Sequence, residues 1–300
     1  MVVLRSVMYV PGNNMRMIEK AQTLPADVIM LDLEDSVPPA EKETARFMVK
    51  DSIEKVGEGG ADVYVRLNGF TTGLMNEDLD ATVQKGLNGV VLPKTEGRDE
   101  VLALEKKLGE LENGKGLEPG SVAVQLLIET ARGVVLSYEA ATASRRLSSV
   151  LFGAVDFTRD MRVELTKEGT ETLHARAQVA LVARAAGIIA IDSPWTTYTD
   201  IEGFMKDTKF GRQLGYEGRM VIHPSQIEPC HQIFTPSKEA IEYARRVVQA
   251  FEDAIKKGTA SVGLEGKMID LAVYRAQKNV LSVVDKIVER ERVRKEKPQV

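Results

Sequence analysis

Eight short apolar runs recur along this chain of 300 residues, and each of them ends in a polar or Gly/Pro-containing signature. Every gap between consecutive runs is long enough for a helix. The runs are rich in β-branched residues and do not alternate between apolar and polar positions, which is typical of parallel strands covered on both faces. This alternation of strands and helices predicts right-handed parallel βαβ units. The runs cover residues 6–12, 28–35, 63–69, 90–94, 122–130, 150–156, 188–194 and 220–224.

Two architectures fit such alternation: a closed (β/α)8 TIM barrel and an open doubly wound sheet. The eight units, and the lack of a Gly-x-Gly-x-x-Gly segment after the first run, favour the barrel. We expect amphipathic helices over residues 14–23, 39–57 and 172–186, the last of them ended by Gly187. Because a TIM barrel carries its active site at the carboxyl ends of its strands, the residues that end the runs are candidate site residues.

The pattern changes after Pro224. Thr235-Pro236-Ser237 is typical of a helix start, and apolar residues follow it at helical spacing. A last helix is expected over about residues 270–292. Between these two helices the chain is expected to be broken by Gly258, Gly263 and Gly266. We therefore predict a catalytic barrel over residues 1–235 and a helical segment over residues 236–300 that acts as a lid, an oligomerisation arm or both.

Composition and charge argue against several classes of protein. The net charge of −4 gives no electrostatic case for binding nucleic acid or an anionic membrane. The single cysteine, Cys230, rules out an internal disulfide and fits a reducing compartment. With no secretory signal and no apolar stretch of about 18 residues, we expect a cytoplasmic protein.

Acidic residues interleave the last basic residues of the chain, which favours a solvated helix end over a binding arm. These basic residues are Arg290, Arg292, Arg294, Lys295 and Lys297.

Two carboxylates, Glu129 and Asp156, close the fifth and sixth runs. Neighbouring strand ends of a barrel lie within reach of one shared ion. Two carboxylates with water and a substrate oxygen suit Mg²⁺, which takes few protein ligands. The alternative is that each acid only caps the helix that follows it. We therefore predict a magnesium site at Glu129 and Asp156 with helix capping as the competing interpretation.

Three further polar residues end runs that we expect to be buried. Arg66 needs a partner, either an acid of the second run or an anionic ligand, and a structural salt bridge is the alternative to a substrate contact. Lys94 could form a Schiff base, although a structural or anion-pairing lysine is favoured. His223 is the histidine at a strand end, whereas His174 and His231 fall elsewhere. No His-x-x-x-His or Cys-x-x-Cys motif is present, so zinc is not expected.

The run ends together resemble the citrate lyase β-subunit-like family of the aldolase superfamily, which includes malyl-CoA, β-methylmalyl-CoA and citramalyl-CoA lyases. The matching stretches follow the family order and cover nearly the whole chain. They are Tyr9-Val10-Pro11-Gly12-Asn13, Leu31-Asp32-Leu33-Glu34-Asp35, Val65-Arg66-Leu67-Asn68-Gly69, Leu92-Pro93-Lys94, Ile128-Glu129-Thr130, Gly153-Ala154-Val155-Asp156, Ile222-His223-Pro224-Ser225-Gln226 and Gly266-Lys267-Met268-Ile269-Asp270.

This resemblance implies a TIM barrel in which Glu129 and Asp156 hold Mg²⁺ and Arg66 contacts the substrate. It implies that Asp270 reaches the active site of an adjacent subunit, so that the protein is a homo-oligomer, a trimer or a hexamer. We expect Asp32, Glu34 and Lys94 to form a supporting charge network. The CoA thioester site would be lined by Tyr9, Lys20, Val155, Ile222 and His223. One position departs from the family: Asn14 stands where many members have an arginine for the CoA phosphates, and Arg16 could substitute for it.

We therefore expect Mg²⁺-dependent, reversible cleavage of a short hydroxy-dicarboxyl thioester, such as malyl-CoA or citramalyl-CoA, into a 2-oxo acid and acetyl-CoA. Arg66 would stabilise the thioester enolate, and Asp270 would be the base in the condensing direction. Two alternatives stay open. One is a citrate lyase β subunit that acts on an acyl-carrier-protein thioester. The other hydrolyses the thioester, as a malyl-CoA thioesterase or malate synthase does. A CoA-free aldolase of simple hydroxy acids is a weaker option.

Overall fold

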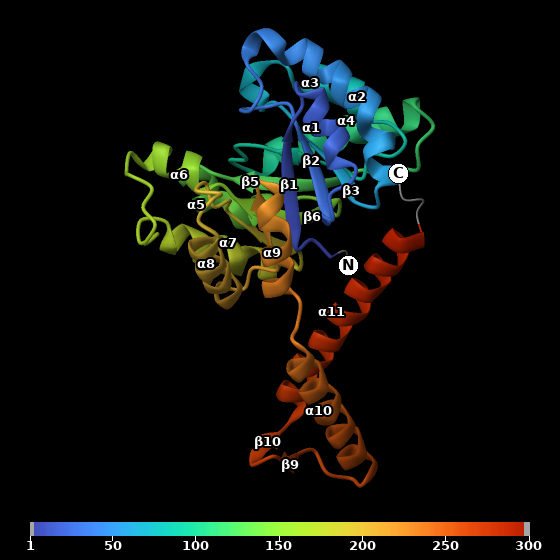
Figure 1. Cartoon of the computed structure of the whole chain (residues 1–300), viewed down its shortest axis with the longest axis vertical. Coiled ribbons are helices and arrows are strands. Elements are labelled where there is room, and N and C mark those ends of the chain that lie inside the picture. Colours follow the sequence, from blue (N-terminus) through green and yellow to red (C-terminus); the bar gives the residue numbers. More distant parts are fainter. Residues whose placement is uncertain (1–2, 297–300) are drawn as a thin grey trace. The chain divides into compact units, whose positions relative to one another are not determined.

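The computed structural model describes residues 3–296 as two compact units (Figure 1). Leu4–Phe234 form the first unit, and Thr235–Glu296, grouped with Val3, form the second. Each unit has its own apolar core.

The first unit is built around a closed barrel of parallel strands, as predicted, and not an open sheet. Each strand pairs with its neighbours in chain order, and β8 returns to β1 through Met220 opposite Val7. The carboxyl ends of parallel strands lie at one end of a barrel, so the polar run ends meet there. The strands are β1 Ser6–Pro11, β2 Val28–Asp32, β3 Asp62–Arg66, β4 Gly89–Leu92, β5 Ala123–Ile128, β6 Leu147–Phe152, β7 Ile189–Asp192 and β8 Gly218–Val221.

Helices connect the strands and surround the barrel (Figure 1). The three helices expected from the sequence are present, although the predicted bounds 39–57 begin with a short 3₁₀ turn, η1 Pro39–Glu41. The α-helices are α1 Met15–Ala21, α2 Lys42–Glu58, α3 Met75–Thr82, α4 Arg98–Gly114, α5 Ala131–Ala141, α6 Ala154–Met161, α7 Leu173–Ala186, α8 Ile201–Leu214 and α9 Ile227–Phe234. Two more 3₁₀ turns are η2 Phe70–Thr72 and η3 Pro224–Gln226.

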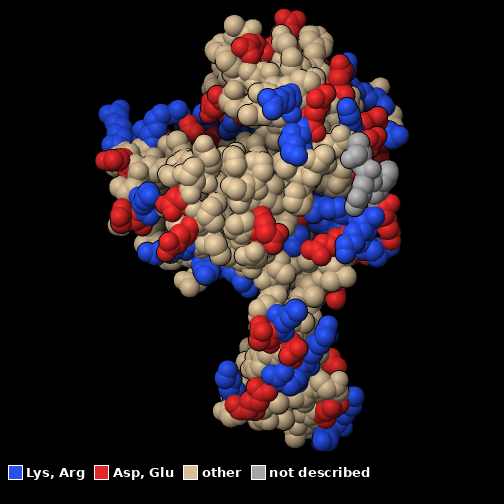
Figure 2. Space-filling view, viewed as in Figure 1, with Lys and Arg blue, Asp and Glu red and all other residues tan. Residues whose placement is uncertain are grey.

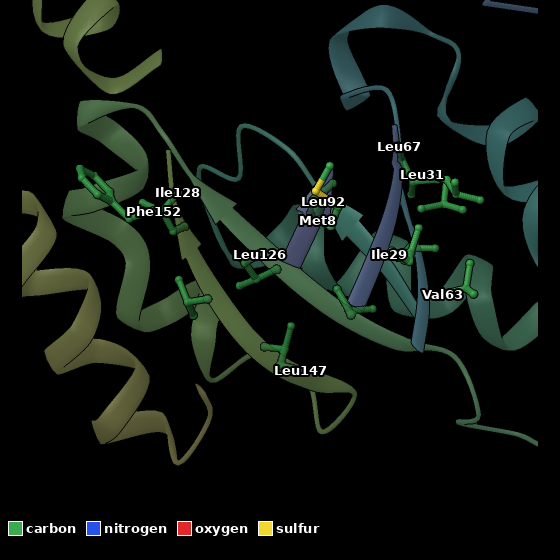
Figure 3. Packing of buried hydrophobic residues seen from close by; sticks show 14 of the residues in the cluster. Met8, Ile29, Leu31, Val63, Leu67, Leu92, Leu126, Ile128, Leu147 and Phe152 are labelled. Carbon is green, nitrogen blue, oxygen red and sulfur yellow. The ribbon is translucent and has the colours of Figure 1, made fainter. Parts of the chain in front are cut away.

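The strands bury apolar side chains on both faces, which is why their sequences do not alternate. In β2, Val28 and Met30 belong to the inner core of the barrel, whereas Ile29 and Leu31 belong to the outer core under the helices. Figure 3 shows part of this outer core, with Ile29 and Leu31 among the labelled side chains. The period of two continues into the polar run ends, so that it places Asp32 on the inner face of the barrel mouth.

The second unit is a helical hairpin closed by two short strands. Helix α10 (Lys238–Lys256) packs against α11 (Leu271–Glu296), and Phe251 stacks on Tyr274 with ring centroids 4.7 Å apart. The chain is interrupted between the two helices, as expected from the glycines, but the hairpin formed there was not predicted: β9 (Val262–Leu264) pairs with β10 (Lys267–Ile269). The turn between them has φ of +51° at Glu265 and +74° at Gly266, which fits the primed turns that close tight hairpins.

The end of α11 carries ion pairs within its own helix. Arg292 contacts Glu289 and Glu296, each at 2.7 Å, as expected for a solvated helix end; Lys297 lies outside the described residues. Figure 2 shows acidic and basic side chains intermixed on the visible face of the molecule. Within residues 3–296, no helix combines the length and the apolar character that crossing a bilayer requires.

Candidate active site

A cavity of about 350 Å³ opens at the carboxyl end of the barrel. It brings together six of the residues singled out in the sequence: Tyr9, Arg66, Glu129, Val155, Asp156 and Ile222. Asp32, expected in a supporting role, and Asp35, another acid of the second run, also line the cavity, together with Ser36, Pro194 and Met220, which sequence reasoning missed. Every one of these residues belongs to the barrel unit.

Arg66 ends β3 inside the mouth of the barrel and is paired there with acids of the second run. Its Nε donates to Asp32 Oδ1 at 2.7 Å and its Nη2 to Asp32 Oδ2 at 2.5 Å, while Nη1 lies 3.0 Å from Glu34 Oε2. Burial favours the protonated form of Asp32, but the charge and hydrogen bonds of Arg66 outweigh it and lower the pKa of Asp32. Asp32 occupies only part of the donors of the guanidinium, so Arg66 can also donate to an oxygen in the cavity.

Lys94 follows β4 and points its ammonium group at acids of the neighbouring turn. Its Nζ donates to Glu34 Oε1 and lies 3.4 Å from Asp35 Oδ2. Burial favours the neutral amine, but these acids outweigh burial and raise the pKa of Lys94. A Schiff-base lysine needs a lowered pKa, so the structure favours the anion-pairing alternative. Burial meanwhile raises the pKa of Glu34, against the opposing charge of Arg66.

Glu129 directly follows β5 and is almost fully buried, with 2% of its surface exposed. Its Oε1 accepts a hydrogen bond from the backbone N–H of Lys94 at 2.9 Å. Thr130, and not Glu129, caps α5, because the Thr130 hydroxyl accepts the N–H of Gly133 at 3.0 Å. Burial raises the pKa of Glu129 to about 8, and the charges of Glu34 and Asp156 add to this effect.

Asp156 does not close the sixth strand, and this prediction was wrong. Strand β6 ends at Phe152, and Asp156 lies in the first turn of α6 after the N-cap Gly153. The N–H of Ala154, the first residue of α6, donates to Ser193 Oγ at 3.0 Å, and a carboxylate is favoured in a first turn. Asp156 still lines the cavity, and its Oδ1 pairs with the exposed Arg159 at 2.5 Å.

The chemistry of these two acids fits a divalent cation. Glu129 is a buried carboxylate whose ionisation is opposed by the nearby charges of Glu34 and Asp156, and a cation between the acids would remove that opposition. Carboxylate oxygens are the ligands that Mg²⁺ prefers, with water completing its shell. Within residues 3–296 no group of three acidic, His or Cys side chains is placed to hold a metal, so the site offers the two carboxylates predicted and not a larger cage.

Tyr9 lines the cavity beside Arg66. The guanidinium carbon of Arg66 is 5.1 Å from the centre of the Tyr9 ring. The Tyr9 hydroxyl is buried, and no described residue forms a hydrogen bond with it. Burial raises the pKa of Tyr9, so the hydroxyl stays neutral at physiological pH.

Of the four other residues expected at the thioester site, two line the cavity and two do not. Val155 and Ile222 line the cavity and are 46% and 39% exposed, which leaves an apolar rim open to a ligand. His223 does not line it; its ring stacks on Tyr198 with centroids 4.7 Å apart, and sequence reasoning had not singled out Tyr198. Lys20 is exposed in the last turn of α1 and does not line the cavity.

Asn14 and Asp270 each occupy a helix-capping position. The side chain of Asn14 accepts the N–H of Met17 at 3.1 Å, while Arg16 is exposed in the same helix. In the second unit, Asp270 Oδ1 accepts the N–H of Val273 at 3.0 Å at the start of α11. The catalytic role of Asp270 remains a prediction, because it belongs to the other unit.

A closed parallel barrel that gathers two carboxylates and a paired arginine around one cavity at its carboxyl end defines a TIM-barrel enzyme. Residues 5–224 match the model of the HpcH/HpaI aldolase/citrate lyase family, and the chain belongs to this family. It is therefore a lyase of the aldolase superfamily, as its run ends suggested.

Known relatives extend the similarity to nearly the whole chain. The citrate lyase subunit beta of Escherichia coli K12 is 38% identical over 93% of this chain and 92% of its own length. The human mitochondrial citramalyl-CoA lyase is 30% identical over 95% of this chain and 87% of its own length. A solved structure of the protein CitE from Mycobacterium tuberculosis, in complex with magnesium, acetoacetate and coenzyme A, has a TM-score of 0.74 and 26% identity. It matches 93% of this chain and 97% of the solved one.

Proposed function

We propose that this protein is a Mg²⁺-dependent carbon–carbon lyase that cleaves, or forms, a short hydroxy-dicarboxyl-CoA thioester such as malyl-CoA or citramalyl-CoA. The products would be a 2-oxo acid, glyoxylate or pyruvate, and acetyl-CoA. The observation that carries the proposal is that Glu129, Asp156 and Arg66 line one cavity. The magnesium and coenzyme A bound to the solved relative support it.

Glu129 and Asp156 would hold the magnesium ion. When bound there, Mg²⁺ supplies Lewis-acid chemistry for an α-hydroxy or 2-oxo acid. The role of the two side chains is to keep their oxygens at the cavity wall in a fixed arrangement. Both are well placed for this, because one follows β5 directly and the other lies in the first turn of α6.

Arg66 would stabilise the negative charge that develops on the thioester. When the carbon–carbon bond breaks, its electron pair passes to the thioester as an enolate, whose oxygen needs a fixed positive donor. Asp32 and Glu34 hold Arg66 at the cavity, so the guanidinium is already oriented before substrate binds. The enzyme therefore spends little free energy on reorganisation during the reaction.

Asp270 would exchange the proton at the enolate carbon. In the condensing direction it takes a proton from the acyl methyl group, and the alkoxide that forms takes one from solvent. In cleavage the hydroxyl proton passes to solvent and Asp270 returns a proton to the enolate carbon. It stands between β10 and α11 in the unit over residues 235–296, and we propose that it serves the barrel of an adjacent subunit of a trimer or hexamer. The C-terminal unit would then act as a lid and as an oligomerisation arm.

One alternative substrate has specific support. The relative with 38% identity is a citrate lyase subunit beta, and Asn14 replaces the arginine expected for CoA phosphates. Both observations favour a citryl thioester of an acyl-carrier protein, cleaved to oxaloacetate. Hydrolysis of a malyl thioester is a further possible outcome of the same site.

Product analysis separates these activities. The purified chain with Mg²⁺ is incubated with malyl-CoA, citramalyl-CoA and a citryl-carrier thioester, and the products are identified by mass spectrometry. The proposal expects a 2-oxo acid and acetyl-CoA from a CoA substrate. Free CoA without an oxo acid would identify a thioesterase, and turnover restricted to the carrier substrate would identify a citrate lyase subunit.

A further inference from the structure

The carboxylate of Glu129 lies between two backbone segments from neighbouring strand ends. On one side the turn after β4 donates the N–H of Lys94 to Oε1 at 2.9 Å. On the other side Oε2 faces Gly153, the residue that follows β6. No described residue donates a hydrogen bond to Oε2. The two oxygens of one carboxylate therefore have different surroundings.

Lys94 makes its contact through an unusual backbone conformation. Its φ is +48°, in the left-handed region that a residue with a β-carbon adopts only at a cost. Backbone strain of this kind persists only where contacts with the surrounding structure hold the residue in place. Here the left-handed turn lets the N–H of Lys94 reach Glu129 while its Nζ reaches Glu34. The same residue therefore contacts the acid that pairs with Arg66 and the proposed metal ligand.

Gly153 is required for its size and not for its conformation. Its φ of −99° is open to any residue. A β-carbon added there would lie 2.6 Å from Glu129 Cβ and 2.6 Å from Oε2, closer than real contacts allow. Glu129 therefore keeps its position only while residue 153 has no side chain.

We infer that the Lys94 N–H and the bare Cα of Gly153 are positioning elements that hold Glu129 in one orientation, with Oε1 engaged and Oε2 left to ligate the divalent cation. This inference rests on the proposed metal site. Mg²⁺ accepts only a narrow range of ligand geometry, so the orientation of a ligating carboxylate controls affinity. Partners that orient a metal ligand typically change affinity by about 10- to 100-fold when they are lost.

Direct metal binding tests this without substrate. The chelator-treated full chain is titrated with Mn²⁺, which shares the carboxylate preference of Mg²⁺, and free Mn²⁺ is measured by electron paramagnetic resonance. Gly153→Ala is expected to weaken binding by about 10-fold or more. Gly114→Ala is the matched control, because nothing lies within 4 Å of its added β-carbon. Circular dichroism and the melting temperature in EDTA confirm that each variant is folded.

Two substitutions at Lys94 test the backbone contact separately. Both variants lose the ammonium contact with Glu34, so they are compared with each other. Lys94→Gly keeps the N–H and accepts a positive φ, so it serves as the reference. Lys94→Val disfavours the left-handed turn and should weaken Mn²⁺ binding by about 10-fold or more relative to Lys94→Gly. This pair decides the question even if Gly153→Ala does not fold.

A double-mutant cycle shows whether Gly153 acts through Glu129. In a Glu129→Ala background, Gly153→Ala should change Mn²⁺ affinity no further. Wild-type affinity in Gly153→Ala or Lys94→Val, with binding lost in Glu129→Ala, would overturn this inference and leave the metal site intact. Wild-type affinity in Glu129→Ala would instead overturn the proposed metal site and this inference with it.

Discussion

Asp32 accepts two hydrogen bonds from Arg66, at 2.7 and 2.5 Å, and this bidentate pair fixes the guanidinium at the mouth of the barrel. Both hydrogen bonds run from the guanidinium to a carboxylate, so Arg66 stays charged and its orientation is fixed. A donor that stabilises a developing enolate needs both properties. The acid that orients the arginine ends β2, and the arginine itself ends β3. The parallel pairing of these two strands puts Asp32 opposite Arg66 and so brings the pair together.

Arg66→Lys should lower kcat by about 100- to 1000-fold, because a single ammonium group cannot keep the bidentate contact and also reach the substrate. KM should change much less. Steady-state kinetics measures both values, with Arg132→Lys as the control, since Arg132 is largely exposed. An unchanged kcat in Arg66→Lys would remove Arg66 from the chemistry.

The residues at the barrel mouth were largely predictable from sequence, because successive side chains of a strand point alternately to its two faces. Tyr64 and Leu127 belong to the inner core. Arg66 and Glu129 each come two residues later, so the period of two places them on the inner face as well. Closure into a barrel then places such residues around one cavity.

Other parts of the site could not be predicted, because they depend on long-range contacts. Asp156 lies in the first turn of α6 and not at a strand end, and the N–H of Ala154 that begins this helix donates to Ser193, which is far along the chain. Tyr198 stacks on His223 through two loops whose relative placement no local pattern encodes. The left-handed turn at Lys94 likewise depends on where β5 places Glu129.

Tyr198→Ala should raise KM for the CoA thioester about three- to tenfold and leave kcat nearly unchanged. The His223 ring, expected at the thioester, loses the aromatic surface that holds it at 4.7 Å. Tyr138→Ala on α5 is the control, since that tyrosine is 53% exposed and does not line the cavity. Equal KM values for the wild type and Tyr198→Ala would exclude a role of the stacked pair in substrate binding.

Asp270→Asn should lower kcat by about 100- to 10,000-fold while the melting temperature stays close to that of the wild type. Asparagine caps a helix as well as aspartate does, so the contact with the N–H of Val273 is kept and only the base is lost.

Mixing this variant with Asp156→Ala tests whether Asp270 acts between subunits. Mixed oligomers contain sites with an intact barrel and an intact partner segment, so part of the activity should return after dissociation and reassembly. If no activity returns, Asp270 does not act in an adjacent subunit.

Glu112 on α4 should make the stability of the barrel unit depend on pH. Burial opposes its ionisation, but hydrogen bonds from Arg146 at 2.7 Å and from the N–H groups of Gly120 and Val122 outweigh burial and lower its pKa. A lowered pKa in the folded state stabilises the protein above the ordinary carboxyl range, and this contribution is lost as the pH falls.

Glu112→Gln should therefore cost about 3 kcal/mol of unfolding free energy at pH 7 and progressively less as the pH falls below about 4.5. Urea unfolding at a series of pH values measures the difference, with the exposed Glu110→Gln on the same helix as control. A difference that grows on acidification would contradict the assignment.

The most direct test of the central claim is the metal dependence of carbon–carbon cleavage, measured as 2-oxo acid released from malyl-CoA or citramalyl-CoA. Chelator-treated enzyme should be inactive, Mg²⁺ should restore turnover, and Asp156→Ala should stay inactive at the same Mg²⁺ concentration. Full cleavage activity in chelator, or in Asp156→Ala, would contradict a magnesium site built from Glu129 and Asp156.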